Sequence, residues 1–279
     1  MRDYYQLTKP GIIYGNALPL AAGFFLASRG IIDWQLFVAV LVGLSLVIAG
    51  GCVFNNYIDR HIDAKMERTR NRALVTGRIS SAHALIFGTV LLLLGCKILF
   101  VFTNLVTLSV ALWGVFTYLA LYTPAKPKTV YAVHIGSLAG AVPPVVGYTA
   151  VTGSLDLTAL TLYLLLIAWQ MPHFFSIALY RMEEYAAAGI PVFPLRHGVY
   201  KTKLAILAYI VAFMFATLTL GIVASLSFFY LLTSTLLGLG WLTLGIFGFK
   251  TLEDTKWARR MFFCSLIVLT VWCATTIFN

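Results

Sequence analysis

Charged residues are scarce in this chain. Asp, Glu, Lys and Arg make up 11% of its 279 residues, whereas a soluble domain usually carries about 25%. Because 60% of the residues are apolar, the composition excludes a disordered chain and argues against a water-soluble globule. The charge that is present is one-sided, with 20 basic residues, 10 acidic residues and a formal net charge of +10.

Cysteine is also rare, and its placement argues against several kinds of site. The four cysteines lie in apolar runs, without a CxxC pair or a CxxCH haem-attachment motif, at Cys52, Cys96, Cys264 and Cys273. We therefore expect small packing residues there, not disulfides or thiolate metal ligands. The five histidines show no HExxH spacing, so no transition-metal site is predicted.

Apolar residues form nine long runs. A hydrocarbon slab takes about 20 helical residues to cross, and lipid-facing backbone must satisfy its own hydrogen bonds, which favours helices. The runs lie at about 12–28, 35–57, 83–102, 105–122, 133–151, 158–179, 204–224, 228–248 and 260–278. The sequence therefore predicts an all-α, polytopic membrane bundle of nine transmembrane helices that forms a single domain over residues 1–279.

The basic residues separate between alternate loops. Eighteen of the 20 lie on one side: Arg2, Lys9, Arg60, Lys65, Arg68, Arg70, Arg72, Arg78, Lys126, Lys128, Arg181, Arg196, Lys201, Lys203, Lys250, Lys256, Arg259 and Arg260. Cytoplasmic loops carry such an excess, so the pattern predicts an N-in, C-out topology. The membrane topology explains the basic charge, and no nucleic-acid partner is expected.

The second run ends in three polar residues spaced by four. This spacing places Asn55, Asp59 and Asp63 on one face of a continuing helix, on successive turns. Two carboxylates so close together repel each other unless a cation lies between them, and Mg²⁺ commonly uses one or two carboxylates with phosphate oxygens. Asp59 and Asp63 are therefore candidate catalytic metal ligands.

Neighbouring residues extend this candidate site. Asn56 lies at the apolar border. The next loop has four basic residues that could bind the phosphates, Lys65, Arg68, Arg70 and Arg72. A solvated helix end with ordinary positive-inside residues is the alternative interpretation.

A second acidic cluster follows the sixth run, which crosses in the same direction as the second. Glu183 and Glu184 are therefore expected on the same membrane face as the first cluster. Either of them is a candidate catalytic metal ligand, and a hydrated loop pair is the alternative. Tyr180, Tyr185 and His173 are candidate substrate-binding residues beside them. A buried structural histidine is the competing interpretation of His173.

Three further features border the same site. Lys126 and Lys128, on the same side again, could bind diphosphate oxygens or could be ordinary loop residues. Pro172 is expected to kink the sixth helix near its end, and Pro143-Pro144 to break the fifth span beside a cavity.

Together these residues fit an allylic diphosphate, which has a long apolar tail and a multiply charged head. A metal would neutralise the leaving diphosphate, and aromatic walls would protect the allylic cation from water. An ion-coupled transporter is one alternative, but it should carry ionisable groups near the midplane. A purely structural membrane subunit is another, which the paired acidic clusters disfavour.

The chain resembles the UbiA superfamily of intramembrane prenyltransferases, and within it the branch that farnesylates heme. The resemblance runs over nearly the full length, through LTKPGI at 7–12, NNYIDRHIDAKMERTRNR at 55–72, IGSLAGAVPPVVGY at 135–148, WQMPHF at 169–174 and EYAAAGIPVFP at 184–194. It implies that Asn55, Asp59 and Asp63 bind Mg²⁺ and farnesyl diphosphate, with Arg68 and Arg72 beside them.

Two positions depart from the family pattern. Glu184 replaces the usual Asp of the second motif, which shifts the reach of that carboxylate, and His61 stands where relatives commonly have an acid.

The resemblance also implies the acceptor and the setting. Heme b would receive the farnesyl group and become heme O, with a quinone-precursor aromatic ring as the nearest rival acceptor. It implies heme A synthase or a terminal oxidase as candidate partners. The expected location is the bacterial cytoplasmic (inner) membrane, with the active site facing the cytoplasm.

Overall fold

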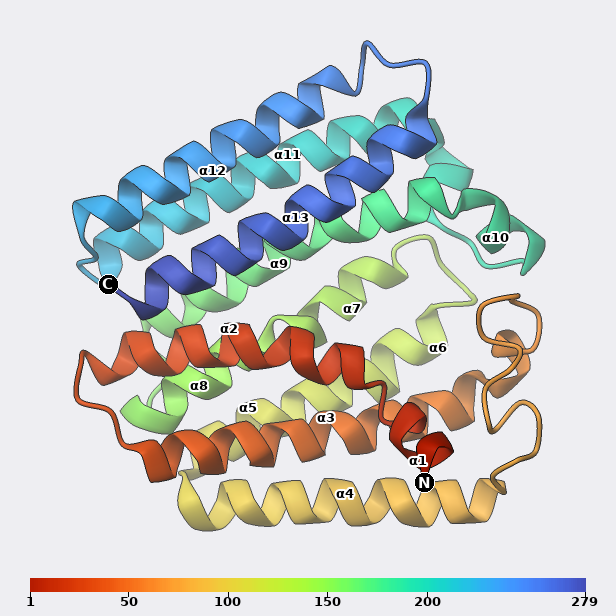
Figure 1. Cartoon of the computed structure of the whole chain (residues 1–279), viewed down its shortest axis with the longest axis horizontal. Helices are drawn as coiled ribbons and strands as arrows, with labels where there is room; N and C mark the ends of the chain where they lie inside the picture. Colours follow the sequence, from red (N-terminus) through yellow and green to blue (C-terminus); the bar gives the residue numbers. More distant parts are fainter.

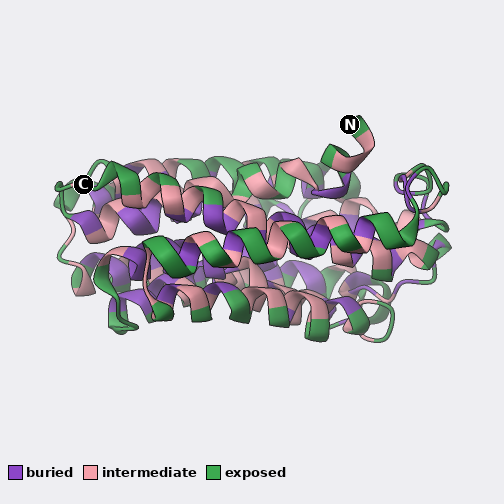
Figure 2. Ribbon diagram, turned by 90° about the horizontal axis from the view of Figure 1, so that it is seen from below, coloured by how far each residue is buried: buried purple, intermediate pink, exposed green.

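The computed structural model describes residues 1–279 and consists of helices and their connections. Nine segments are long and apolar enough to cross a membrane, as the sequence predicts. Five of the spans are α2 (Pro10–Ser28), α4 (Ser81–Phe102), α11 (Phe193–Val223), α12 (Phe228–Phe247) and α13 (Asp254–Ile277). The helices lie side by side in one bundle, with exposed residues on their outward faces and buried residues between them (Figure 1, Figure 2).

The other four spans carry most of the candidate site. They are α3 (Trp34–Asp63), α9 (Leu157–Tyr180), the Leu105–Ala125 segment and the Ala132–Thr152 segment. The Leu105–Ala125 segment contains α5 (Leu105–Phe116), a π-helical turn η1 (Thr117–Tyr122) and α6 (Thr123–Ala125). Two short helices, α1 (Arg2–Leu7) and α10 (Met182–Ala187), lie outside the spans.

The fifth span is divided, as the paired prolines predict. Helix α7 (Ala132–Gly140) ends at Ala141, and α8 (Val142–Thr152) restarts with Pro143 and Pro144 in its first turn. Proline is tolerated there because the first backbone N–H groups of a helix have no intrahelical acceptor. By contrast, α9 continues from Pro172 to Tyr180, so this proline does not end its helix.

Three helices extend further than their apolar runs. Helix α3 continues to Asp63, α11 begins at Phe193 and bends at Gly198, and α13 begins at Asp254. Gly198 has φ +81°, a conformation that residues with a side chain rarely adopt. Hydropathy finds only the apolar part of each helix, and the polar continuations lie at the end of the bundle where α10 and the 64–80 loop gather (Figure 1).

The acidic residues at the other end of the bundle have structural partners. Asp33 accepts a hydrogen bond from the Leu36 backbone N–H at the start of α3, and Asp156 accepts one from Ala159 N–H at the start of α9. Each carboxylate thus satisfies a backbone donor that the helix leaves free. These two residues are helix caps.

Helices α2 and α8 approach each other through glycine. A Cβ added to Gly23 would lie 1.9 Å from the carbonyl oxygen of Pro144, and one added to Gly147 would lie 2.1 Å from that of Leu20. Small residues permit such close backbone contact in membranes. This contact holds the divided fifth span against α2, beside the site.

We expect Gly23→Ala to lower the free energy of unfolding by about 1–3 kcal/mol, because the added methyl group must displace the backbone of α8. Thermal unfolding of the detergent-solubilised protein measures the effect. Gly240→Ala is the matched control, because a Cβ there meets nothing within 4 Å. Equal unfolding midpoints for the two variants would contradict the packing argument.

Candidate functional site

A cavity of about 1030 Å³ opens at the polar end of the bundle. Its walls come from α2, α3, α5, η1, α7, α9 and α13, and they combine a charged rim with an apolar and aromatic interior. Asn55, Asp59, Asp63, Arg68, Arg72, Lys126, His173, Tyr180 and Tyr185 all line it. Most of the site residues expected from the sequence therefore share one chamber.

The three polar residues of α3 are buried on successive turns of one helix face. Asn55, Asp59 and Asp63 are each at most 2% exposed. Burying a carboxylate is costly unless it is paired and hydrogen-bonded. Their surroundings must therefore supply positive charge and hydrogen-bond donors.

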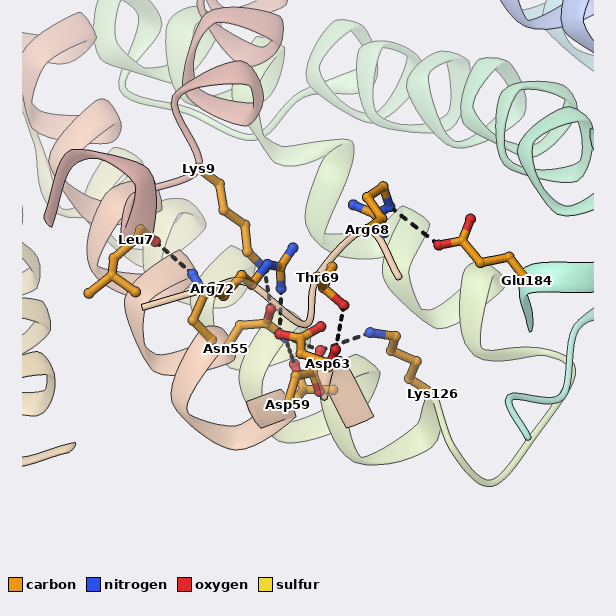
Figure 3. Close-up of polar contacts among 12 residues, drawn as sticks. Leu7, Lys9, Asn55, Asp59, Asp63, Arg68, Thr69, Arg72, Lys126 and Glu184 are labelled. Carbon is orange, nitrogen blue, oxygen red and sulfur yellow. Dashed lines mark hydrogen bonds and ion pairs between the residues drawn. The ribbon is translucent and has the colours of Figure 1, made fainter. Parts of the chain in front are cut away.

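Each of these residues faces a cation from a different part of the chain (Figure 3). The Lys9 ammonium group, from the link between α1 and α2, donates to Asn55 Oδ1. Lys126 Nζ lies 2.9 Å from Asp59 Oδ2, and Arg72 Nη1 lies 2.5 Å from Asp63 Oδ2. Three segments thus meet on one helix face.

Lys9 is a site residue that the sequence interpretation did not single out. Its backbone has φ +52°, which is unusual for a residue other than glycine, and burial lowers the pKa of its ammonium group to about 8. It therefore remains largely protonated at neutral pH. The sequence signal was a lysine directly before the first span, in a turn with Pro10 and Gly11.

The hydrogen bond between α6 and α3 was also not predicted from the sequence. Asn55 Nδ2 donates to Thr123 Oγ1 over 2.9 Å, and the Thr123 hydroxyl donates to the Tyr118 carbonyl oxygen over 2.8 Å. The rings of Tyr118 and Tyr122 stack with centroids 5.7 Å apart, and both line the cavity. The π-helical turn, a feature often found at functional sites, places this aromatic pair beside Asn55.

The 64–80 loop folds back over the end of α3. Thr69 Oγ1 donates to the Asp63 carbonyl oxygen over 2.8 Å, and this turn brings Arg72 to the Asp63 carboxylate. Asn56 lies outside the main cavity. Its Nδ2 donates to the Leu7 carbonyl oxygen over 2.8 Å and so ties α1 to α3, beside a smaller cavity of about 490 Å³.

Glu184, on α10, lies next to the cavity but is not one of the residues that line it. Its Oε2 accepts a hydrogen bond from Arg181 Nη1 over 2.9 Å, and its Oε1 lies 3.8 Å from Arg68 Nε. Glu183 is exposed, whereas Glu184 is partly buried and pairs with two arginines that line the cavity. Burial raises the pKa of the adjacent Tyr185 hydroxyl, which keeps it protonated as a hydrogen-bond donor.

The carboxylate oxygens of the site suit a metal ion that is bound partly by the protein and partly by a substrate. No three Asp, Glu, His or Cys side chains converge as an all-protein cage. Asp59 Oδ1 and Glu184 Oε1 are buried without a hydrogen-bond partner, as carboxylate oxygens intended for a ligand would be. Mg²⁺ characteristically takes one or two carboxylates and completes its shell with phosphate and water.

Lys128 differs from Lys126. It is exposed and does not line the cavity, because the turn after α6 directs only Lys126 towards α3. The rim therefore uses one lysine of this pair.

His173 lies deeper, on the wall formed by α9 and α13. Its ring stacks on Trp169 with centroids 5.0 Å apart, and its Nδ1 lies 2.8 Å from Ser265 Oγ. The Ser265 hydroxyl donates its single proton to the Phe262 carbonyl oxygen, so Nδ1 of the histidine is the donor to Ser265. This assigned tautomer leaves a lone pair on His173 Nε2, the nitrogen available to a metal centre.

Known proteins match the chain over its length. It is 48% identical over 283 residues to the protoheme IX farnesyltransferase of Protochlamydia amoebophila (strain UWE25), covering 100% of this chain and 99% of the relative. It is 47% identical over 271 residues to the protoheme IX farnesyltransferase of Edwardsiella ictaluri (strain 93-146), covering 97% and 92%.

Solved structures share the fold at low sequence identity. Digeranylgeranylglyceryl phosphate synthase has a TM-score of 0.82 at 18% identity, covering 99% of this chain and 97% of that one. A UbiA homolog from Archaeoglobus fulgidus bound to GPP and Mg²⁺ has a TM-score of 0.70 at 16% identity, covering 99% and 100%.

The sequence model of the UbiA prenyltransferase family matches residues 16–267, which include the α3 carboxylates and most of the cavity wall. Together with the full-length relatives, this match shows that the chain belongs to the UbiA prenyltransferase family.

Proposed function

We propose that this prenyltransferase moves a farnesyl group from farnesyl diphosphate to a vinyl group of heme b and so makes heme O. The observation that carries the choice of substrates is the 48% identity, from end to end, to a relative named protoheme IX farnesyltransferase. The cavity supports it chemically. Its charged rim suits a diphosphate, and its interior suits a prenyl chain and a macrocycle.

We assign the diphosphate to the rim. Asp59 and Asp63 would hold Mg²⁺, with Asn55 and Glu184 as further ligands, and the bound ion would offset the negative charge that develops on the leaving diphosphate. Lys9, Arg72 and Lys126 already lie at these side chains. They would turn towards the phosphate oxygens when the metal takes the carboxylates.

The other residues protect and direct the reaction. The stacked faces of Tyr118 and Tyr122 would stabilise the allylic cation and exclude water from it. The cation adds to the terminal carbon of the vinyl group, and water captures the neighbouring carbon and loses a proton. The balance is heme b, farnesyl diphosphate and water in, and heme O and diphosphate out.

His173 would hold the heme. Its Nε2 lone pair is suited to the iron, and Trp169 offers an aromatic wall beside it. This assignment distinguishes heme from a quinone-precursor ring, because the ring would have no use for an iron ligand.

We propose further that the polar end faces the cytoplasm of a bacterial inner membrane, in an N-in, C-out topology. The basic loops support this orientation through the positive-inside bias. Heme A synthase or a terminal oxidase would then use the product. A transporter is disfavoured, because Asp33 and Asp156 at the opposite end cap helices.

Asp59→Asn and Asp63→Asn should each lower farnesyl transfer by at least about 100-fold, because each removes a negative charge that holds the metal. Turnover is measured with purified protein, Mg²⁺ and both substrates, and thermal unfolding checks the fold. Glu67→Gln changes an exposed residue of the 64–80 loop that follows α3; it is the control and should retain activity. Full activity of both Asp variants would end the metal assignment.

Mass spectrometry of the pigment after incubation with heme b, farnesyl diphosphate and Mg²⁺ should show a gain of one farnesyl group plus water. Parallel incubation with an aromatic quinone precursor tests the rival acceptor. Modification of the quinone precursor and not of heme b would replace the proposed acceptor.

His173→Ala should weaken heme b binding by at least about tenfold, because the iron loses a nitrogen ligand in a water-poor site. The Soret band of the bound heme measures this directly, without turnover. His61→Ala removes an exposed histidine at the end of α3 and should leave the titration unchanged. Identical heme titrations for His173→Ala and the unmodified protein would remove His173 from the pocket.

A further inference from the structure

An aromatic path runs from His173 to the rim of the cavity. The His173 and Phe262 ring centroids are 4.8 Å apart, and those of Phe262 and Tyr180 are 5.8 Å apart. All three residues line the cavity, and they come from the two packed helices α9 and α13. The path therefore forms one continuous aromatic wall of the cavity that Asn55, Asp59 and Asp63 of α3 also line.

Two guanidinium groups end this path. The Cζ atoms of Arg181 and Arg259 lie 5.3 and 5.8 Å from the ring centroid of Tyr180. Arg181 is engaged with Glu184 through one nitrogen, so it retains further N–H donors. Arg259 is exposed and has no acidic partner within ion-pair distance. Arg259 is not one of the residues that line the cavity, but it lies over Tyr180, which does, so its charge is available to a ligand that extends out of the cavity past Tyr180.

The spacing along α9 gives the depth of the wall. His173 and Tyr180 are seven residues apart, which is about 10 Å along a helix. In heme b the two propionates leave one edge of the macrocycle, and the vinyl groups point away from that edge. Heme with its iron at His173 could therefore hold its carboxylates at the arginines and its vinyl groups inside the chamber.

The arrangement on α3 is compatible with this orientation. Asn55 lies two turns before the end of α3, and His173 lies two turns before the end of α9, at the same end of the bundle (Figure 1). The wall with His173 thus faces the stack of Asn55, Asp59 and Asp63 across one cavity. A vinyl group inside the chamber would meet the reactive carbon of a prenyl diphosphate held at the rim.

We propose that Arg259, together with Arg181, binds the propionates of the heme substrate beside Tyr180 and so fixes which edge of the macrocycle enters the cavity. This inference rests on the proposed function, since it specifies how that acceptor is held. Arginine forms bidentate hydrogen bonds with carboxylates, and its charge is retained at any working pH. A lipid phosphate is the other oxyanion that an exposed arginine at this surface could bind.

The test compares heme b with its dimethyl ester, in which both propionates are neutral. Soret titrations of the full-length protein in detergent give the dissociation constant of each pigment. The unmodified protein should bind the ester about tenfold more weakly than heme b, because charge-assisted hydrogen bonds are lost. Arg259→Gln should bind heme b about threefold more weakly and should discriminate against the ester by only about threefold, because Arg181 remains.

Two further variants sharpen the comparison. Arg260→Gln changes the next residue, which is also exposed but does not lie over Tyr180, and should discriminate between the pigments as the unmodified protein does. Arg259→Lys keeps the charge without the bidentate geometry and should recover part of the discrimination.

The results separate this inference from the proposed function. If the unmodified protein farnesylates heme b but Arg259→Gln discriminates against the ester as strongly as the unmodified protein does, only the propionate site is excluded. Equal loss of affinity for both pigments in Arg259→Gln would also overturn it, since a structural or lipid-binding role has that effect. Failure of the unmodified protein to bind or modify heme b would remove both proposals.

Discussion

The need to neutralise two buried carboxylates on one helix face governs this structure. An unpaired charge buried in a membrane protein is costly, so Asp59 and Asp63 require cations. Lys126 and Arg72 supply them, and Lys9 completes the set at Asn55. Each cation belongs to a different connecting segment, which explains why the start of α2, the 64–80 loop and the turn after α6 all fold against the end of α3. In the proposed function, the same cations would bind the diphosphate when a metal ion takes their place at the carboxylates.

The irregular parts of the backbone surround this charged rim. The π-helical turn η1 and the break between α7 and α8 both lie in spans that border the cavity. Non-helical backbone at membrane depth is tolerated where it is buried in protein or lines a cavity. In this chain the irregularity has chemical consequences, because η1 brings Tyr118 and Tyr122 into a stack beside Asn55. The apolar interior and the charged rim therefore meet at an aromatic surface, where an allylic cation would form.

Local patterns in the sequence predicted the membrane spans and the polar face of α3. They could not predict which residues from other segments contact that face. Spacing by four is a property of one helix, so the stack of Asn55, Asp59 and Asp63 followed directly from it. Lys9 pairs with Asn55 across 46 residues, and no periodicity links two such positions. Sequence alone could not distinguish Lys126 from Lys128 as a site residue, because the turn after α6 determines which of the two lysines reaches α3. The resemblance to a known family named the substrates, which composition could not have done.

The central claim is that the α3 carboxylates exchange their basic partners for a metal ion bound to a diphosphate. A crystal structure with Mn²⁺ and a non-ionising thiolo analogue of farnesyl diphosphate tests this most directly, because Mn²⁺ is located by its anomalous scattering. The account predicts Mn²⁺ in direct contact with Asp59 and Asp63, with Lys126 and Arg72 turned to the phosphate oxygens. Mn²⁺ bound away from both carboxylates, with their ion pairs to Lys126 and Arg72 intact, would contradict it.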